Sequence, residues 1–193
     1  MKSPKKMSAI QMIAIGSSAG GIDILKKILI RLPKGFIPSI IVVQHIGAES
    51  HQTLAQFFSE LCQIPVKEAE DKEKIDGGTV YFAPSGYHLL VEENQSFALN
   101  LDPLVNFARP SIDVLMETAA AAFGEKMMGV ILTGANQDGA AGIKKIGEMG
   151  GITVAQDPLE AAYSAMPQAA IDIAELDYIL TSEKIVDLIA GLH

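Results

Sequence analysis

The chain has 193 residues, of which 49% are hydrophobic, and it carries a formal net charge of −8. This length suits one α/β domain with a core large enough to fold alone, and the apolar content excludes a largely disordered chain. The acidic balance argues against a nucleic-acid backbone as partner, and no apolar run reaches the length of a membrane span. A single cysteine, Cys62, excludes an internal disulfide framework and is typical of a reducing cytoplasm.

Strands and helices alternate over the first third of the sequence. Residues 1–9 are expected to form a solvated leader, and residues 10–193 a single domain. Short β-branched runs predict strands, and apolar residues that recur every three or four positions predict helices. The predicted strands are 10–15, 39–44 and 66–69, and the predicted helices are 22–32 and a segment that contains Leu54, Phe57, Phe58 and Leu61 and ends before Pro65.

The rest of the chain begins with a change of pattern and then alternates again. Three short runs punctuated by glycine and proline, 79–83, 88–92 and 96–101, are expected to be antiparallel strands at a sheet edge or an appended hairpin. Further helices are predicted over 112–123 (with Ser111 as N-cap), 140–149, 166–173 and 182–192, and further strands over 127–132, 152–155 and 178–180. This alternation predicts an α/β fold with a doubly wound, mostly parallel sheet, helices on both faces and an antiparallel edge hairpin.

A turn of small residues follows the first predicted strand. The spacing Gly16-x-Ser18-x-Gly20 suits a nucleophile elbow, because glycines admit dihedral angles that other residues resist and a sharp turn raises the hydroxyl above the sheet edge. Backbone N–H groups at the start of the next helix would face negative charge beside that hydroxyl. Phosphate-binding loops and helix caps look similar, so the turn alone leaves these alternatives open.

Polar side chains follow three of the most apolar strands. Ser18 follows the first strand, His45 follows the second, and Asp138 lies in the loop after 127–132. Functional residues gather beyond the carboxyl ends of parallel strands, so we expect these three to meet at one sheet edge. They are the groups of nucleophilic acyl transfer: His45 takes the Ser18 proton, and Asp138 fixes the imidazole tautomer and stabilises its cation.

Other classes of site have weaker support in the sequence. His51, His88 and His193 show no metal-ligand spacing with nearby carboxylates or with Cys62, and neither a metal nor a cofactor is predicted. A non-catalytic module that binds a phosphate or nucleotide is the lower-ranked alternative. No P-loop lysine follows the glycines, and no ribose-binding acidic residue is evident.

Five segments, spread from the first strand to the last helix, carry a family resemblance when they are taken together. They are Ile15-Gly16-Ser17-Ser18-Ala19-Gly20-Gly21, Val43-Gln44-His45, Arg109-Pro110-Ser111-Ile112-Asp113, Leu132-Thr133-Gly134 with Asp138-Gly139-Ala140, and Ala155-Gln156-Asp157 with Met166-Pro167. In this order they resemble the catalytic domain of CheB, the bacterial chemotaxis protein-glutamate methylesterase. The resemblance implies Ser18 as nucleophile, His45 as general base and Asp138 as orienting carboxylate. The implied reaction is hydrolysis of γ-glutamyl methyl esters, with release of methanol.

The sequence departs from the family pattern in the loops around the expected site. Ala19 stands where the family often has threonine, and Ala135-Asn136 replace a methionine and a glycine. The resemblance implies that Ala19, Ala135 and Met166 belong to the oxyanion and active-site loops, with the Ala135 N–H kept as a donor and Met166 at the rim. The changed loop favours, as an alternative, a hydrolase of a different small acyl ester.

The resemblance also sets expectations about partners. No acidic phosphoacceptor region precedes Ile10, so we expect this chain to lack the receiver domain that family members usually carry. The expected partners are helices of a methylated chemoreceptor or sensory protein, together with a separate receiver or methyltransferase protein. Direct membrane insertion is not expected, and the expected location is the cytoplasm.

Overall fold

The computed structural model describes residues 7–45 and 53–192. Lys2, Lys5 and Lys6 of the expected leader lie outside these residues, and Met7–Ala9 form a short 3-10 helix before the first strand. In the described part of the chain, no helix combines the length and the apolar character that crossing a bilayer requires.

A seven-stranded parallel sheet forms the centre of the molecule. Its order is β3-β4-β2-β1-β7-β8-β9, and every neighbouring pair is parallel. The strands are β1 (Met12–Ser17), β2 (Ser39–Gln44), β3 (Val66–Glu68), β4 (Val80–Phe82), β7 (Met127–Ile131), β8 (Ile152–Gln156) and β9 (Tyr178–Leu180). The chain winds outward from β1 in one direction and from β7 in the other. A crevice between such strands, at their carboxyl ends, is the usual ligand site of a doubly wound sheet.

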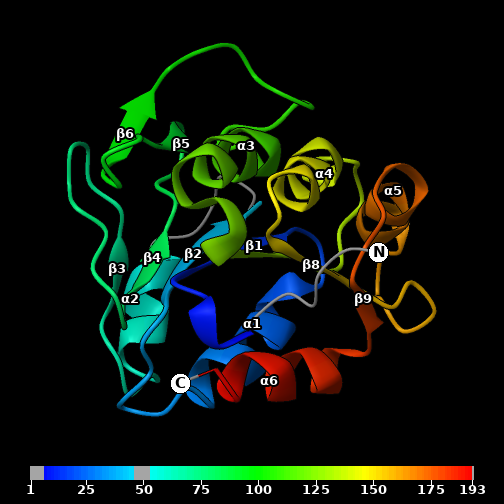
Figure 1. Ribbon diagram of the computed structural model, residues 1–193, viewed down its shortest axis with the longest axis horizontal. Coiled ribbons are helices and arrows are strands. Elements are labelled where there is room, and N and C mark those ends of the chain that lie inside the picture. Colours follow the sequence, from blue (N-terminus) through cyan, green and yellow to red (C-terminus); the bar gives the residue numbers. More distant parts are fainter. Residues whose placement is uncertain (1–6, 46–52, 193) are drawn as a thin grey trace.

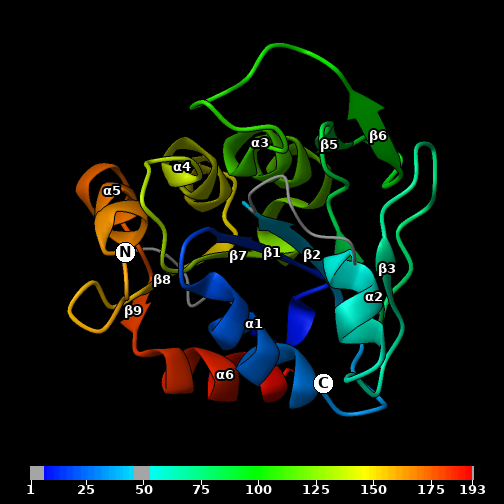
Figure 2. The ribbon, with the colours of Figure 1, turned by 180° about the vertical axis from the view of Figure 1, so that it is seen from behind.

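Helices cover both faces of this sheet, as Figures 1 and 2 show. On one face lie α1 (Gly21–Ile30), α2 (Leu54–Ser59) and α6 (Ser182–Ala190), and on the other lie α3 (Ile112–Phe123), α4 (Ala140–Glu148) and α5 (Ala165–Ile173). Successive side chains of β1 enter different cores: Ile13 and Ile15 pack with the first group, and Met12 and Ala14 with the second. The continuously apolar strands of the sequence are therefore buried on both sides, as expected for a parallel sheet.

One strand differs from the sequence prediction. The run 79–83 was expected to pair antiparallel, but β4 pairs parallel with β2 and β3 inside the main sheet. Val80, Tyr81 and Phe82 are all buried, so this run is a two-sided core strand that glycine and proline punctuation makes look like part of a hairpin. The other two runs, β5 (His88–Val91) and β6 (Phe97–Asn100), do form an antiparallel pair.

The β5–β6 pair is a small separate sheet beside α3 (Figure 1). The Val91 N–H donates to Thr118 Oγ1 of α3 at 3.1 Å. At its other end α3 begins at Ser111, whose hydroxyl accepts from the Val114 N–H at 3.4 Å, as the sequence predicts for an N-cap. This start of α3 lies directly over the end of β1, because a Cβ on Gly16 would stand 2.4 Å from Ile112 Cγ2.

Candidate active site

The turn after β1 has the tight geometry that its small residues predict. The Ser18 N–H donates to the carbonyl of Thr133 at 3.0 Å, and the Ser18 carbonyl accepts from the Gly21 N–H at 3.0 Å. Gly20 adopts a φ of +79°, a left-handed conformation that favours glycine. Ser18 is half-buried at the carboxyl end of the sheet, where α1 begins.

His45 directly follows β2 and is tied to the end of β1. The backbone N–H of His45 donates to the carbonyl of Ser17 at 3.0 Å. The side chain of Gln44 adds a second link, because its Nε2 donates to the carbonyls of Ser18 and His45, each at 2.8 Å. The predicted nucleophile and base are therefore backbone neighbours across adjacent strands.

Asp138 is fully buried at the N-terminus of α3. Its Oδ2 accepts from the Ile112 N–H at 2.7 Å, and its Oδ1 accepts from Ser111 Oγ at 2.8 Å and from the Asp113 N–H at 3.2 Å. Asn106 Nδ2 donates to the same Oδ1 at 3.2 Å. Peptide N–H groups at a helix N-terminus favour negative charge, so this position suits a carboxylate.

The two buried carboxyl groups at this helix start have opposite pKa shifts. Burial by itself raises the pKa of Asp138, but the nearby imidazole of His45 and hydrogen bonds from Ile112, Ser111 and Asn106 outweigh burial and hold this pKa below the ordinary value. For Asp113, burial is the largest cause and raises the pKa, despite the hydrogen bond from the Gly142 N–H.

The imidazole of His45 joins the buried carboxylate to the open side of the site. Its Nε2 lies 3.0 Å from Asp138 Oδ2, although the ring N–H is not aligned as in an ideal hydrogen bond. Its Nδ1 lies 3.4 Å from Asn136 Nδ2, while Asn136 Oδ1 accepts the Asp138 N–H at 3.1 Å. The carboxylate beside Nε2 favours the tautomer with its proton on Nε2, which leaves the Nδ1 lone pair to act as a base.

The residues expected in the oxyanion and rim loops lie in different environments. Ala19 is half-buried in the turn after Ser18, and its carbonyl accepts from Thr133 Oγ1 at 3.0 Å. Ala135 is exposed in the loop that leads to Asp138. Met166 is fully buried, and a Cβ on Gly134 would stand 2.6 Å from Met166 Cε. Met166 therefore supports this loop from below instead of lining an exposed rim.

Several residues that shape the site were not assigned to it from the sequence. The side chain of Gln44 links the ends of β1 and β2 through hydrogen bonds, and Ser111 and Asn106 donate hydrogen bonds to the Asp138 carboxylate. His88, which shows no metal-ligand spacing in the sequence, is buried beside this helix start: its Nδ1 accepts from the Ser111 N–H at 3.2 Å, and its Nε2 donates to the Pro103 carbonyl at 3.0 Å. The available signal was position: Gln44 directly precedes His45, and Asn106 and Ser111 lie just before the predicted 112–123 helix.

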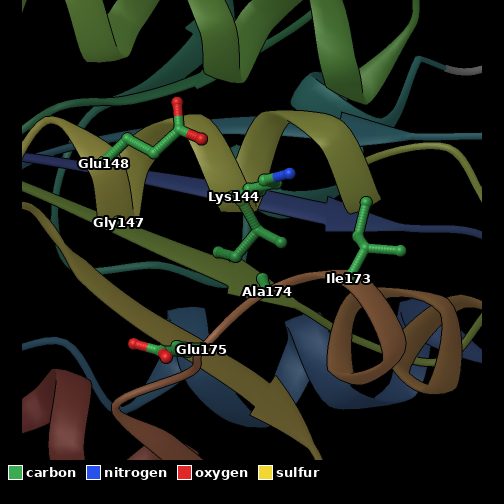
Figure 3. Close-up of a pocket in the computed structure, with 7 residues that line it drawn as sticks. Lys144, Gly147, Glu148, Ile173, Ala174 and Glu175 are labelled. Atoms are coloured by element: carbon green, nitrogen blue, oxygen red, sulfur yellow. The ribbon is translucent and has the colours of Figure 1, made fainter.

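Two hollows in the surface contain none of the predicted site residues. One, of about 320 Å³, lies where the end of α4 meets the end of α5 and is lined by residues such as Lys144, Gly147 and Ile173 (Figure 3). The other, of about 660 Å³, lies between α1 and α6. Within residues 7–45 and 53–192 there is no cluster of three or more histidine, cysteine or acidic side chains that would hold a metal ion.

Comparison with known proteins connects this geometry to a family. The family model for CheB methylesterase matches residues 13–189. The crystal structure of the Thermotoga maritima CheB methylesterase catalytic domain superposes with a TM-score of 0.87 at 35% identity, covering 93% of this chain and 97% of that one. Both the sequence match and the structural match span nearly the whole chain.

The chain is similar to relatives of about its own length and to relatives about twice as long. A Leptospira interrogans protein is 51% identical over 182 residues, which are 94% of each chain. Proteins of Syntrophus aciditrophicus and Hydrogenovibrio crunogenus, both named protein-glutamate methylesterase/protein-glutamine glutaminase, are 38% identical over 94% of this chain. The chain spans 54% and 49% of their lengths. Because the family model, these relatives and the shared fold each cover nearly all of its residues, the chain belongs to the CheB methylesterase family.

Proposed function

We propose that Ser18, His45 and Asp138 form the catalytic triad of a serine esterase that hydrolyses glutamate γ-methyl esters on chemoreceptor-type signalling proteins. The observation that carries this proposal is the 3.0 Å contact between His45 Nε2 and the fully buried Asp138 Oδ2. A buried carboxylate beside a histidine, with a serine at the adjacent strand end, is the arrangement of nucleophilic acyl transfer.

The proposed reaction proceeds in two halves. Ser18 Oγ attacks the ester carbonyl while His45 Nδ1 takes its proton, and the proton then passes to the methoxy oxygen, which leaves as methanol. Water next attacks the Ser18 acyl ester while His45 Nδ1 takes one of its protons, and His45 passes that proton to Ser18 Oγ as the glutamate product departs and ionises to the carboxylate. Asp138 remains ionised throughout and stabilises the imidazolium. The Ala135 N–H is the proposed oxyanion donor, and Ala19, in the turn after Ser18, is the other proposed residue of the active-site loops.

The substrate and partners follow from the family. We propose that residues 10–193 act as one catalytic domain on helices of a methylated chemoreceptor or sensory protein in the cytoplasm. A separate receiver or methyltransferase protein is the proposed regulatory partner. The names of the relatives support the ester substrate, and the acidic chain, with its net charge of −8, is consistent with a protein partner in place of nucleic acid.

Ser18→Ala tests the proposal. The hydroxyl is half-buried at a turn end, so its loss leaves the fold intact, while removal of a triad serine lowers turnover by about 10⁴- to 10⁶-fold. The measurement is methanol release from a methylated receptor fragment, with circular dichroism to verify folding. Undiminished methanol release from folded Ser18→Ala contradicts the triad. Activity confined to simple esters, with none on the receptor fragment, instead favours the small acyl ester alternative.

A further inference from the structure

The side chain of Gln44 continues the pairing of β1 and β2 past the point where the backbone ladder stops. In this ladder Ser17 is the register partner of Gln44, and the His45 N–H to Ser17 carbonyl bond, at 3.0 Å, is its last rung. Ser18 and His45 are the next residues on each strand. Their carbonyls both accept from Gln44 Nε2, each at 2.8 Å, so one amide group binds the peptide units of both residues.

The orientation of this amide is determined by its surroundings. Gln44 Oε1 accepts from Ser17 Oγ at 2.5 Å, and Gln44 is only 7% exposed. A flipped amide would direct its oxygen at two carbonyl oxygens and remove the Nε2 donor from both, which is costly even though the Ser18 carbonyl would keep its bond from the Gly21 N–H. The space is also fitted to the amide, since a Cβ on Gly21 would stand 2.7 Å from Gln44 Oε1. Glycine at position 21 leaves room for this contact.

We infer that Gln44 is a positioning residue that sets the distance between the nucleophile and the base, an inference that rests on the proposed triad. Gln44 donates to the backbone of Ser18 and of His45 and needs no contact with the substrate. Without this link, the backbone bond from the His45 N–H to the Ser17 carbonyl remains as the connection between these two strand ends that the described residues show. A misplacement of reacting groups by about 1 Å lowers turnover by roughly 10²-fold.

Gln44→Met and Ser17→Ala form a matched pair of variants. Methionine has nearly the length of glutamine but donates no hydrogen bond, so Gln44→Met removes the contacts to both carbonyls. Ser17→Ala removes only the hydroxyl that donates a hydrogen bond to Gln44 Oε1. For folded Gln44→Met we expect kcat for ester hydrolysis to fall about 10²-fold with KM nearly unchanged. Ser17→Ala keeps both Nε2 contacts to the carbonyls and loses one bond to the amide oxygen, so we expect a smaller fall in kcat than for Gln44→Met.

A second readout separates positioning from stability. The rate at which Ser18 reacts with a fluorophosphonate reports the reactivity of the serine with its base and does not depend on recognition of the natural substrate. We expect this rate to fall with kcat in Gln44→Met. A loss of thermal stability with wild-type kcat and phosphonylation rate in the folded protein overturns the inference. Wild-type hydrolysis by Ser18→Ala would instead place the fault with the triad itself.

If Gln44→Met does not fold, the wild-type protein still provides a test by NMR. Because Gln44 is buried and both Nε2 protons are hydrogen-bonded to carbonyls, its side-chain amide is expected to exchange slowly with water and to shift when Ser18 is phosphonylated. Gln56, whose side chain lies in the exposed capping box of α2, is the internal control and is expected to do neither. Fast exchange at Gln44, or no shift on modification of Ser18, overturns the inference.

Discussion

Replacement of Asp138 by asparagine tests the electrostatic design of the site. The change keeps the size of the side chain but converts one acceptor oxygen into a donor. On the Oδ2 side, the new amino group would meet the Ile112 N–H, now 2.7 Å from the oxygen, and His45 Nε2 at 3.0 Å. On the Oδ1 side, it would meet the Asp113 N–H at 3.2 Å and the amide of Asn106 at 3.2 Å. Each orientation places a donor against a peptide donor.

Both the activity and the stability are expected to fall. With its amino group toward His45, the introduced asparagine selects the tautomer with the proton on Nδ1, so the base cannot accept the Ser18 proton, and kcat falls about 10⁴-fold. A buried peptide N–H left without an acceptor costs about 1–3 kcal/mol. At 2–4 °C per kcal/mol for a chain of this size, Tm drops by roughly 2–12 °C.

Asp113→Asn is the matched control. Asp113 is also buried at the start of α3, and it accepts from the Gly142 N–H at 2.7 Å and from Asn106 Nδ2 at 2.7 Å. Asp113→Asn removes a comparable acceptor without contacting His45, so we expect its Tm to fall while methanol release remains. Methanol release from a methylated receptor fragment and thermal unfolding are measured on both variants. Equal kcat values for folded Asp138→Asn and Asp113→Asn refute the reasoning.

Two further predictions concern stability. The pKa of Asp138 is lower in the folded state, so its carboxylate stabilises the fold above the unfolded-state pKa of about 3.9, and this contribution is lost as the pH falls through the folded pKa. In urea unfolding, the gap between wild type and Asp138→Asn should therefore narrow below about pH 4, and a constant gap contradicts the assignment. Gly16→Ala places a Cβ 2.4 Å from Ile112 Cγ2 and should cost about 1–3 kcal/mol. An unchanged free energy of unfolding would show that α3 can shift away from β1.

Most of the fold is predictable because its strands are buried on both sides. Runs such as 40–43 and 127–131 are apolar throughout, and the helices between them show one apolar stripe, so the alternation indicates a parallel sheet. The parallel pairing of β4 was not predictable from local pattern. A run of three buried residues between glycine and proline turns fits either a hairpin or an inner strand, and only its place between β2 and β3 decides.

The candidate site divides in the same way. Ser18, His45 and Asp138 follow the most apolar strands, so their shared edge was expected from topology alone. The residues that hold these three in place were not expected, because their contacts depend on side-chain directions across distant segments. Asn106 and Ser111 reach Asp138 over 32 and 27 positions of sequence, and Gln44 reaches back to Ser18 over 26. The buried position of Met166 has the same origin, since the contact with Gly134 forms only when α5 packs beneath the loop.

The way in which Asp138 is stabilised has a chemical consequence for His45. Apart from His45 itself, the donors to this carboxylate are peptide N–H groups, the Ser111 hydroxyl and the Asn106 amide, all of which are neutral. They keep the buried carboxylate ionised without placing a positive charge beside the imidazole. A lysine or arginine in their place would also hold the carboxylate, but it would repel the imidazolium that forms when His45 takes a proton. Neutral donors at a helix N-terminus therefore leave the full attraction of the carboxylate to the proposed base, at the step where its charge develops.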